Sequence, residues 1–182
     1  MRIISGKARG TKLYTLEGTN TRPTLDRVKE SIFNIIQNEI EDSTVLDLFA
    51  GSGAIGLECL SRGAKKAVLC DKSKEAIEII KRNIEKTHME EKAKVINLDF
   101  ETCLEKVKNE QFDIIYIDPP YATDYIFKSL MKIKEFGIAK NESLIIIETD
   151  DEQRILKEIG NIEIKIVDKR KYGRATIIFL EI

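Results

Sequence analysis

Residues 44–71 read TVLDLFAGSGAIGLECLSRGAKKAVLCD, and this stretch decides the fold class. The apolar run 44–49 predicts a short buried strand, and residues 66–71 predict a second one. Between them, residues 53–63 predict a helix that ends at Gly63. A strand, a helix and a strand in immediate succession indicate a βαβ unit, in which the two strands run parallel. We therefore expect a parallel sheet covered by helices.

The same alternation continues along the rest of the chain. Further strands are predicted at 93–99, 112–118 and 143–149, and further helices at 73–87, 100–108, 125–136 and 151–160. Ser73 is the expected N-cap of the helix at 73–87. The tail, 162–182, predicts two strands joined near Tyr172 and Gly173, and a tight turn makes such strands antiparallel. The pattern predicts an α/β fold, a seven-stranded, mostly parallel, doubly wound sheet with an antiparallel last strand.

We expect one domain that spans residues 1–182, with the core at 43–182 and an extension at 1–42. Within the extension, residues 2–16 predict two short strands around a turn at Gly6–Gly10, which is a hairpin. A helix is expected next, because apolar residues recur at helical spacing. Thr24 or Asp26 would cap this helix, and Pro23 would set its entry. The apolar stripe consists of Val28, Ile32, Ile35, Ile36 and Ile40.

Composition excludes several classes of protein. Of the 182 residues, 42% are hydrophobic and 34% are charged, which is typical of a globular chain. No apolar run approaches the roughly 18 residues that a membrane span needs, and the N-terminus lacks the apolar stretch of a secretory signal. These features predict a cytoplasmic protein. The three scattered cysteines and the single histidine predict neither a disulfide framework nor a metal site.

The glycine loop carries the first functional motif. Gly51, Gly53 and Gly56 follow a strand, open a helix and fit GxGxxG, a spacing that lets the backbone approach a ligand closely. This motif alone is weak, since dinucleotide-binding proteins share it. Asp47 sharpens it, because a carboxylate at the strand end suits a cationic ligand, such as the amino group of a methionine moiety, better than a pyrophosphate. We therefore expect S-adenosylmethionine here and not NAD.

Two further acids end the next two predicted strands. Asp71 could accept hydrogen bonds from both hydroxyls of a ribose, a role that nucleoside cofactors of several kinds use. Asp99 could accept from an adenine amino group, with Phe100 packed on the ring. For Asp99 alone, a role as the N-cap of the following helix is almost equally expected.

The motif Asp118-Pro119-Pro120-Tyr121 points to the chemistry. The lone pair of a nucleobase amino group is delocalised into the ring, so the nitrogen is a poor nucleophile. The Asp118 carboxylate and the Pro119 carbonyl can accept its two hydrogens, which favours a tetrahedral nitrogen with its lone pair turned toward a methyl donor. Tyr121 can stack on the base, which is worth about 1–3 kcal/mol. Positioning then supplies most of the rate acceleration.

These motifs resemble those of a known family. DPPY and DLFAGSG are the signatures of class I amino-group methyltransferases, which have a Rossmann-like fold. RIISGKARGTKL, TRPTLDRVKESIFNII and KYGRATI in addition resemble blocks of the bacterial RsmD family across nearly the whole chain. The resemblance implies methylation of the 2-amino group of one guanine in 16S ribosomal RNA, within a 30S subunit or an assembly intermediate. One departure is Asp71, where relatives usually carry Glu.

The resemblance also assigns roles to residues. The catalytic residues would be Asp118, Pro119, Pro120 and Tyr121. The residues that bind S-adenosylmethionine would be Asp47, Phe49, Ala50, Gly51, Ser52, Gly53, Asp71, Lys72, Asp99, Phe100, Arg22 and Thr24.

The charge distribution agrees with a nucleic-acid substrate. Residues 1–30 carry a net charge of +4 and residues 165–182 carry +3, whereas the middle of the chain is acidic. Such basic flanks can bind phosphates around an extruded base, although charged, solvated flanks are also common. The basic residues expected to contact RNA are Arg2, Lys7, Arg9, Lys12, Lys169, Arg170 and Lys171.

Three other functions remain as alternatives. A DNA amino methyltransferase would share DPPY, but such enzymes usually need an added recognition domain. An NAD-dependent oxidoreductase would leave DPPY without a role. A non-catalytic module is disfavoured by the intact motifs around Asp47 and Asp118.

Overall fold

A computed structural model describes residues 1–16, 23–121, 123–160, 162 and 164–182, with residues 23–26 described only by their place in a helix. Seven strands form one mixed sheet in the order β3-β2-β1-β4-β5-β7-β6. The strands are β1 Thr44–Asp47, β2 Lys66–Asp71, β3 Ala93–Asn97, β4 Phe112–Ile117, β5 Ala139–Thr149, β6 Lys165–Tyr172 and β7 Ala175–Glu181. The helices are α1 Pro23–Ile35, the 3₁₀ helix η1 Gln37–Glu39, α2 Ala54–Ser61, α3 Lys74–Thr87, α4 Phe100–Lys106, α5 Tyr125–Phe136 and α6 Glu152–Ile159.

The predicted α/β fold is confirmed. Strands β3, β2, β1, β4 and β5 pair in parallel, and β7 is antiparallel to both β5 and β6. The expected N-cap of α3 is also present, because the Ser73 hydroxyl accepts from the backbone N–H of Ala76. Among the described residues, no helix is long and apolar enough to cross a membrane.

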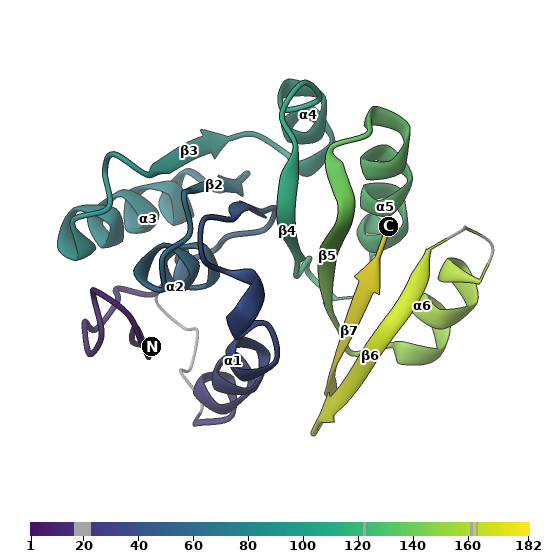
Figure 1. Cartoon of the computed structure of the whole chain (residues 1–182), viewed down its shortest axis with the longest axis horizontal. Coiled ribbons are helices and arrows are strands. Elements are labelled where there is room, and N and C mark those ends of the chain that lie inside the picture. Colours follow the sequence, from purple (N-terminus) through teal and green to yellow (C-terminus); the bar gives the residue numbers. More distant parts are fainter. Residues whose placement is uncertain (17–22, 122, 161, 163) are drawn as a thin grey trace.

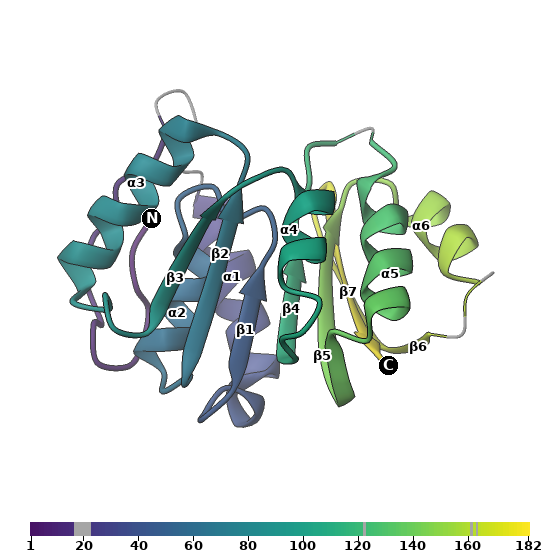
Figure 2. The same ribbon diagram turned by 90° about the horizontal axis from the view of Figure 1, so that it is seen from above.

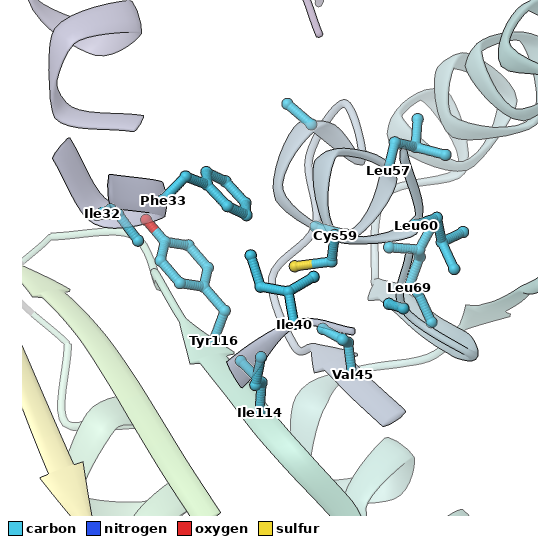
Figure 3. Packing of buried hydrophobic residues seen from close by; sticks show 14 of the residues in the cluster. Ile32, Phe33, Ile40, Val45, Leu57, Cys59, Leu60, Leu69, Ile114 and Tyr116 are labelled. Atoms are coloured by element: carbon cyan, nitrogen blue, oxygen red, sulfur yellow. The ribbon is translucent and has the colours of Figure 1, made fainter. Parts of the chain in front are cut away.

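Helices cover both faces of the sheet. Helices α1, α2 and α3 lie on one face, and α4, α5 and α6 lie on the other (Figures 1 and 2). Alternation along each strand divides the core accordingly: Val45 packs with the first group of helices, and the next residue, Leu46, packs with the second. Figure 3 shows the first core, where Phe33 of α1 lies beside Tyr116 of β4 and where Leu57 of α2 and Ile114 of β4 belong to the same cluster. Burial on both faces explains why the strands read as continuous apolar runs.

The strand order turns back at β1 and β4. From β1 the chain runs outward to β2 and β3, and it then returns to place β4 on the other side of β1. Ligands of open α/β sheets bind outside the carboxyl ends of the strands at such a reversal. The ends of β1 and β4 carry Asp47 and Asp118, so both motifs lie at this point of the sheet.

The expected N-terminal hairpin is not shown as a pair of strands. Residues 2–16 hold a single antiparallel bridge, between Arg2 and Lys12, and no strand. Backbone hydrogen bonds pair residues 1–3 with residues 10–13, and beyond this short pairing a side chain of α2 bonds the backbone of the arm. The Glu58 carboxylate accepts from the N–H groups of Ile4 and Ser5, at 2.7 and 2.9 Å. We call residues 1–16 the N-terminal arm.

The helix after the arm is shorter than the apolar stripe predicted. Helix α1 ends at Ile35, and a 3₁₀ turn over Gln37–Glu39 completes the segment. Ile35 is accordingly 39% exposed, whereas the stripe residues Val28, Ile32 and Ile36 are buried. The expected cap residues Thr24 and Asp26 lie outside the part whose side chains are described.

Glu58 is the buried charge that holds the arm, α1 and α2 together. Its carboxylate lies 3.1 Å from the ammonium of Lys29, which is also buried, and 2.8 Å from Nε of Arg62. Removing Glu58 takes this carboxylate away from the buried Lys29 ammonium and removes the acceptor of the Ile4 and Ser5 N–H groups. We expect Glu58→Ala to lower the free energy of unfolding by about 3–5 kcal/mol, measured by urea denaturation. Glu78→Ala, which removes an exposed carboxylate paired with Lys81, should cost less than about 1 kcal/mol. Equal losses would contradict the assignment.

Candidate active site

Two adjoining cavities open at the carboxyl ends of β1 and β4. The smaller, of about 250 Å³, is lined by Asp47, Tyr116, Glu148 and residues of α1. The larger, of about 660 Å³, is lined by the four residues 118–121 and by the acids expected to bind adenosine. Phe49, Gly51 and Asp118 line both cavities. The glycine loop and the DPPY motif are therefore neighbours, because the β1–β4 pairing sets their strands side by side.

The glycine loop leaves open space for a ligand. Gly51 has φ +54, and a Cβ built on it would meet nothing within 4 Å, so only the missing side chain keeps this space free. The Gly51 N–H donates to Asp71 Oδ2 at 2.9 Å, and the Ala50 N–H donates to the Cys70 carbonyl at 2.8 Å. Gly56 lacks a side chain for a different reason, because a Cβ there would lie 2.1 Å from the Leu69 side chain of β2. The loop thus combines a ligand cradle with close helix–sheet packing.

Asp47 is buried and only half satisfied. Its Oδ2 accepts from the Gly56 N–H at 3.2 Å, whereas Oδ1 has no hydrogen-bond partner. Burial raises the pKa of Asp47 to about 7, and the charge of Asp71 adds to the rise. A buried carboxylate oxygen without a partner fits a ligand that brings a cation or an N–H group. Asp47 and Gly51 therefore fit the methionine end of S-adenosylmethionine.

Asp71 is held by its own loop. Its Oδ1 accepts from the Ser73 N–H and its Oδ2 from the Gly51 N–H, each at 2.9 Å. Each carboxylate oxygen has a second lone pair, and Asp71 lines the larger cavity beside Lys72. Its role toward a ribose stays a prediction, as does any role of Lys72.

Asp99 acts as the N-cap of α4, as the alternative interpretation had it. Its two carboxylate oxygens accept from the N–H and the hydroxyl of Thr102, at 3.0 and 2.7 Å. These hydrogen bonds lower the pKa of the exposed Asp99 carboxyl. Asp99 also lines the larger cavity, so its contact with adenine remains a prediction.

Three aromatic rings form the apolar wall of the larger cavity. The ring centroids of Phe49 and Phe100 lie 5.5 Å apart, and those of Phe100 and Tyr125 lie 4.8 Å apart. The rings of Phe49 and Tyr125 are nearly parallel, with an interplanar angle of 6°. Sequence reasoning found Phe49 and Phe100 and missed Tyr125. A signal was present, since Tyr125 follows DPPY closely and opens the next helix.

The DPPY motif joins a half-buried acid to an exposed ring. Burial, followed by the charges of Glu148 and Asp47, raises the pKa of Asp118 well above its usual value. Pro119 is buried, whereas Tyr121 is 59% exposed at the mouth of the larger cavity. Neither proline carries an N–H group, so the corner adds no donor beside the carboxylate. The motif therefore offers acceptors below an accessible aromatic face.

Glu148 and Tyr116 are two further site residues that sequence reasoning missed. Glu148 near the end of β5 is 7% exposed, and its Oε2 accepts from the Tyr116 hydroxyl at 2.7 Å. Burial raises the pKa values of both side chains. The signal was an acid that directly follows the apolar run Ile145–Ile147. Together with Asp47 and Asp118, Glu148 makes the smaller cavity a site with three acids.

The structure describes some of the other residues expected to bind the cofactor or act in catalysis, and it leaves others out. Arg22 and the side chain of Thr24 lie outside the described residues. Ala50, Ser52 and Gly53 belong to the glycine loop, and Pro120 lines the larger cavity.

Within the described part of the chain, no group of three or more His, Cys, Asp or Glu side chains is arranged to hold a metal ion.

The basic residues expected to contact RNA fall into two groups. Arg2, Lys7, Arg9 and Lys12 are exposed on the N-terminal arm. On β6, Lys169 pairs with Glu152, and Arg170 pairs with Asp168 at 2.9 Å. These acids partly neutralise the β6 group, so the arm is the better candidate for binding phosphates. The contacts of both groups with RNA stay predictions.

The fold and the motifs at its strand ends are those of the class I methyltransferases, whose methyl donor is S-adenosylmethionine, and this chain is one of them. Within that class, the chain belongs to the family described as Conserved hypothetical protein 95, whose model matches residues 1–181. The predicted membership of the RsmD family is thereby confirmed.

Relatives and solved structures agree over most of the chain. The Bacillus subtilis protein YlbH is 36% identical over 95% of this chain and 94% of its own length. Ribosomal RNA small subunit methyltransferase D of Haemophilus influenzae is 36% identical over 86% of this chain and 82% of its own length. The structure of yhhF from Escherichia coli is similar at a TM-score of 0.86, with 29% identity, and the match covers 100% of this chain and 97% of that one.

The raised pKa of Asp47 predicts how stability changes with pH. In the unfolded chain this carboxyl ionises near its ordinary pKa of 3.8, but in the folded protein it ionises only near 7. The folded state therefore binds more protons between these values, and its free energy of unfolding falls as pH rises toward 7. Asp47→Asn removes this pH-dependent fall in the free energy of unfolding, because Asn does not ionise. The unliganded variant should therefore be more stable than wild type at pH 8, by about 1–3 kcal/mol.

The advantage should shrink as the pH is lowered to 5, which denaturation at several pH values will show. Glu90→Gln changes an exposed carboxyl and serves as the control. Parallel stability curves for Asp47→Asn and wild type would contradict the buried-carboxylate assignment.

Proposed function

We propose that this protein methylates the exocyclic 2-amino group of one guanine in the 16S RNA of the small ribosomal subunit. The observation that carries the proposal is the shared cavity of Gly51 and Asp118, because it sets the DPPY acceptors beside the loop that fits the donor. The relative from Haemophilus influenzae, named a small subunit rRNA methyltransferase, supports this choice of substrate. The RNA would be met within a 30S subunit or an assembly intermediate.

When bound, S-adenosylmethionine supplies an electrophilic methyl group. Asp47 and the Gly51 loop hold its methionine end, while Asp71, Asp99 and Phe100 line the space for its nucleoside. A buried carboxylate at Asp47 pairs with the ammonium, which keeps the charge of both compensated inside the protein. An NAD pyrophosphate would instead place its charge against this carboxylate. The orphan Oδ1 of Asp47 thus favours the methyl donor over a dinucleotide.

The DPPY corner prepares the nucleophile. The Asp118 carboxylate and the Pro119 carbonyl accept the two hydrogens of the target amino group, so its lone pair turns out of the base plane. Tyr121, exposed at the cavity mouth, stacks on the extruded base. The amino nitrogen loses a proton after methylation, and Asp118, whose pKa burial raises, is suited to accept it. Fixed geometry and not a strong base supplies the acceleration.

Asp118→Ala should reduce turnover by about 100-fold or more while the affinity for S-adenosylmethionine changes little, because the residue acts on the amino group. Transfer of a tritiated methyl group to small subunits from a strain that lacks this gene measures turnover, and calorimetry measures the affinity. Mapping the labelled base identifies the target. Asp124→Ala, which removes an exposed carboxylate six residues further on, should leave both values unchanged. Equal loss of turnover and cofactor affinity would contradict the role of Asp118.

The N-terminal arm should contribute to phosphate binding. Changing Arg2, Lys7 and Arg9 to Gln should weaken RNA binding and reduce the slope of log affinity against log salt by about 2, since each lost phosphate contact on single-stranded RNA removes about 0.7. Filter binding at several salt concentrations measures this slope. Changing Lys92, Lys106 and Lys108, exposed lysines outside the arm, just before β3 and at the end of α4, is the matched control. A slope that stays at the wild-type value would exclude the arm.

A further inference from the structure

Glu148 and Asp118 lie beside each other at the carboxyl ends of two adjacent strands, β5 and β4. In the parallel β4–β5 pair, Tyr116 lies opposite Ile146, and each strand reaches its acid two residues later. Side chains two residues apart share a face, and adjacent strands lie about 4.8 Å apart. Tyr116 and Ile146 both belong to the core under α1, so both acids point toward this face, as their shared cavity confirms. Figure 2 shows β4 and β5 side by side.

Tyr116 holds Glu148 in one orientation. Its ring is fixed in the core beside Ile32 and Phe33 (Figure 3), and its hydroxyl donates to Glu148 Oε2 at 2.7 Å. Burial raises the pKa of Tyr116 well above 10, so the hydroxyl stays a donor. No described residue forms a hydrogen bond with Glu148 Oε1. The protein thus supports one carboxylate oxygen and leaves the other for a ligand in the cavity.

The geometry points to Glu148 as the residue that selects guanine, with Oε1 accepting the N1–H hydrogen of the target base. The inference rests on the proposed function, in which Asp118 and Pro119 take the hydrogens of the 2-amino group. On guanine, N1–H lies directly beside that amino group, so a second acceptor beside Asp118 meets the next donor along the same edge. An acid that only stabilised the fold would not need a free oxygen in this cavity.

A base without N1–H is rejected for a physical reason. In 2-aminopurine, the 2-amino group is retained but N1 carries a lone pair, which would face the buried carboxylate. A site that accepts a hydrogen bond from its substrate discriminates strongly against an analogue that lacks this donor, because the buried acceptor of the site is then left without a partner. A Gln side chain in place of Glu148 can donate to that lone pair, so it would shift the preference toward 2-aminopurine.

The test compares two RNA substrates. Small-subunit RNA is rebuilt by ligation with guanine or 2-aminopurine at the mapped target position, assembled into subunits, and methylated by wild type and by Glu148→Gln. The assay is run at alkaline pH, because burial raises the pKa of Glu148. Wild type should prefer guanine, and Glu148→Gln should lower this preference by about 10- to 100-fold, with unchanged affinity for S-adenosylmethionine. Glu142→Gln, at the other end of β5, is the matched control and should keep the wild-type preference.

Tyr116→Phe is the second variant, because it removes only the hydroxyl that orients Glu148. As a positioning residue, Tyr116 should affect the same guanine preference in the same direction but less strongly, with no change in cofactor affinity. A loss of activity that is equal on both RNAs, in a folded Glu148→Gln protein, would overturn the inference alone. A wild-type enzyme that transfers no methyl group to the guanine substrate would overturn the proposed function, and the inference with it.

Discussion

The parallel pairing of β1 with β4 is the constraint on which the site depends. Val45 lies opposite Ile114 and Asp47 opposite Tyr116, so the two strands end at the same edge of the sheet. The chain between them passes through two other strands and three helices, yet the glycine loop and the DPPY corner line the same cavities. The strand register therefore brings the two motifs together at one place in the sheet, as the proposed methyl transfer between them requires. Both strands are buried on both faces, which keeps this register from slipping.

The same edge concentrates acids that the fold alone does not need. Burial raises the pKa values of Asp47, Asp118 and Glu148, which means that the unliganded protein holds these groups at a cost in stability. Ligands that bring an ammonium, a sulfonium and N–H groups return this cost as binding energy, because they supply the missing partners. Functional sites commonly contain such buried charges, which lower the stability of the protein but serve its function. It also explains why Asp47 Oδ1 has no partner within the protein.

Closure of the smaller cavity relies on a second buried network. Glu58 ties the backbone of the N-terminal arm to Lys29 of α1, and Met1 and Lys29 line the cavity above Asp47. Asn83 extends the link, since its side chain bonds the backbone of Tyr14 and the Ser52 carbonyl of the glycine loop. The arm that carries the exposed basic residues is thus linked to the glycine loop through the side chain of Asn83.

Periodicity and short motifs in the sequence were enough to determine the α/β class, the order of strands and helices, the Ser73 cap and the two principal motifs, because each depends on residues close together in the chain. They left open whether Asp99 caps a helix or contacts adenine, and they could not determine that Glu58 bonds the backbone of the N-terminal arm or that Glu148 joins the site. Glu148 and Tyr116 are 32 residues apart, and Glu58 and Ile4 are 54 apart. No local pattern encodes such pairs, since they arise only when the sheet register and helix packing bring distant polar groups into one buried space, where each must find a partner.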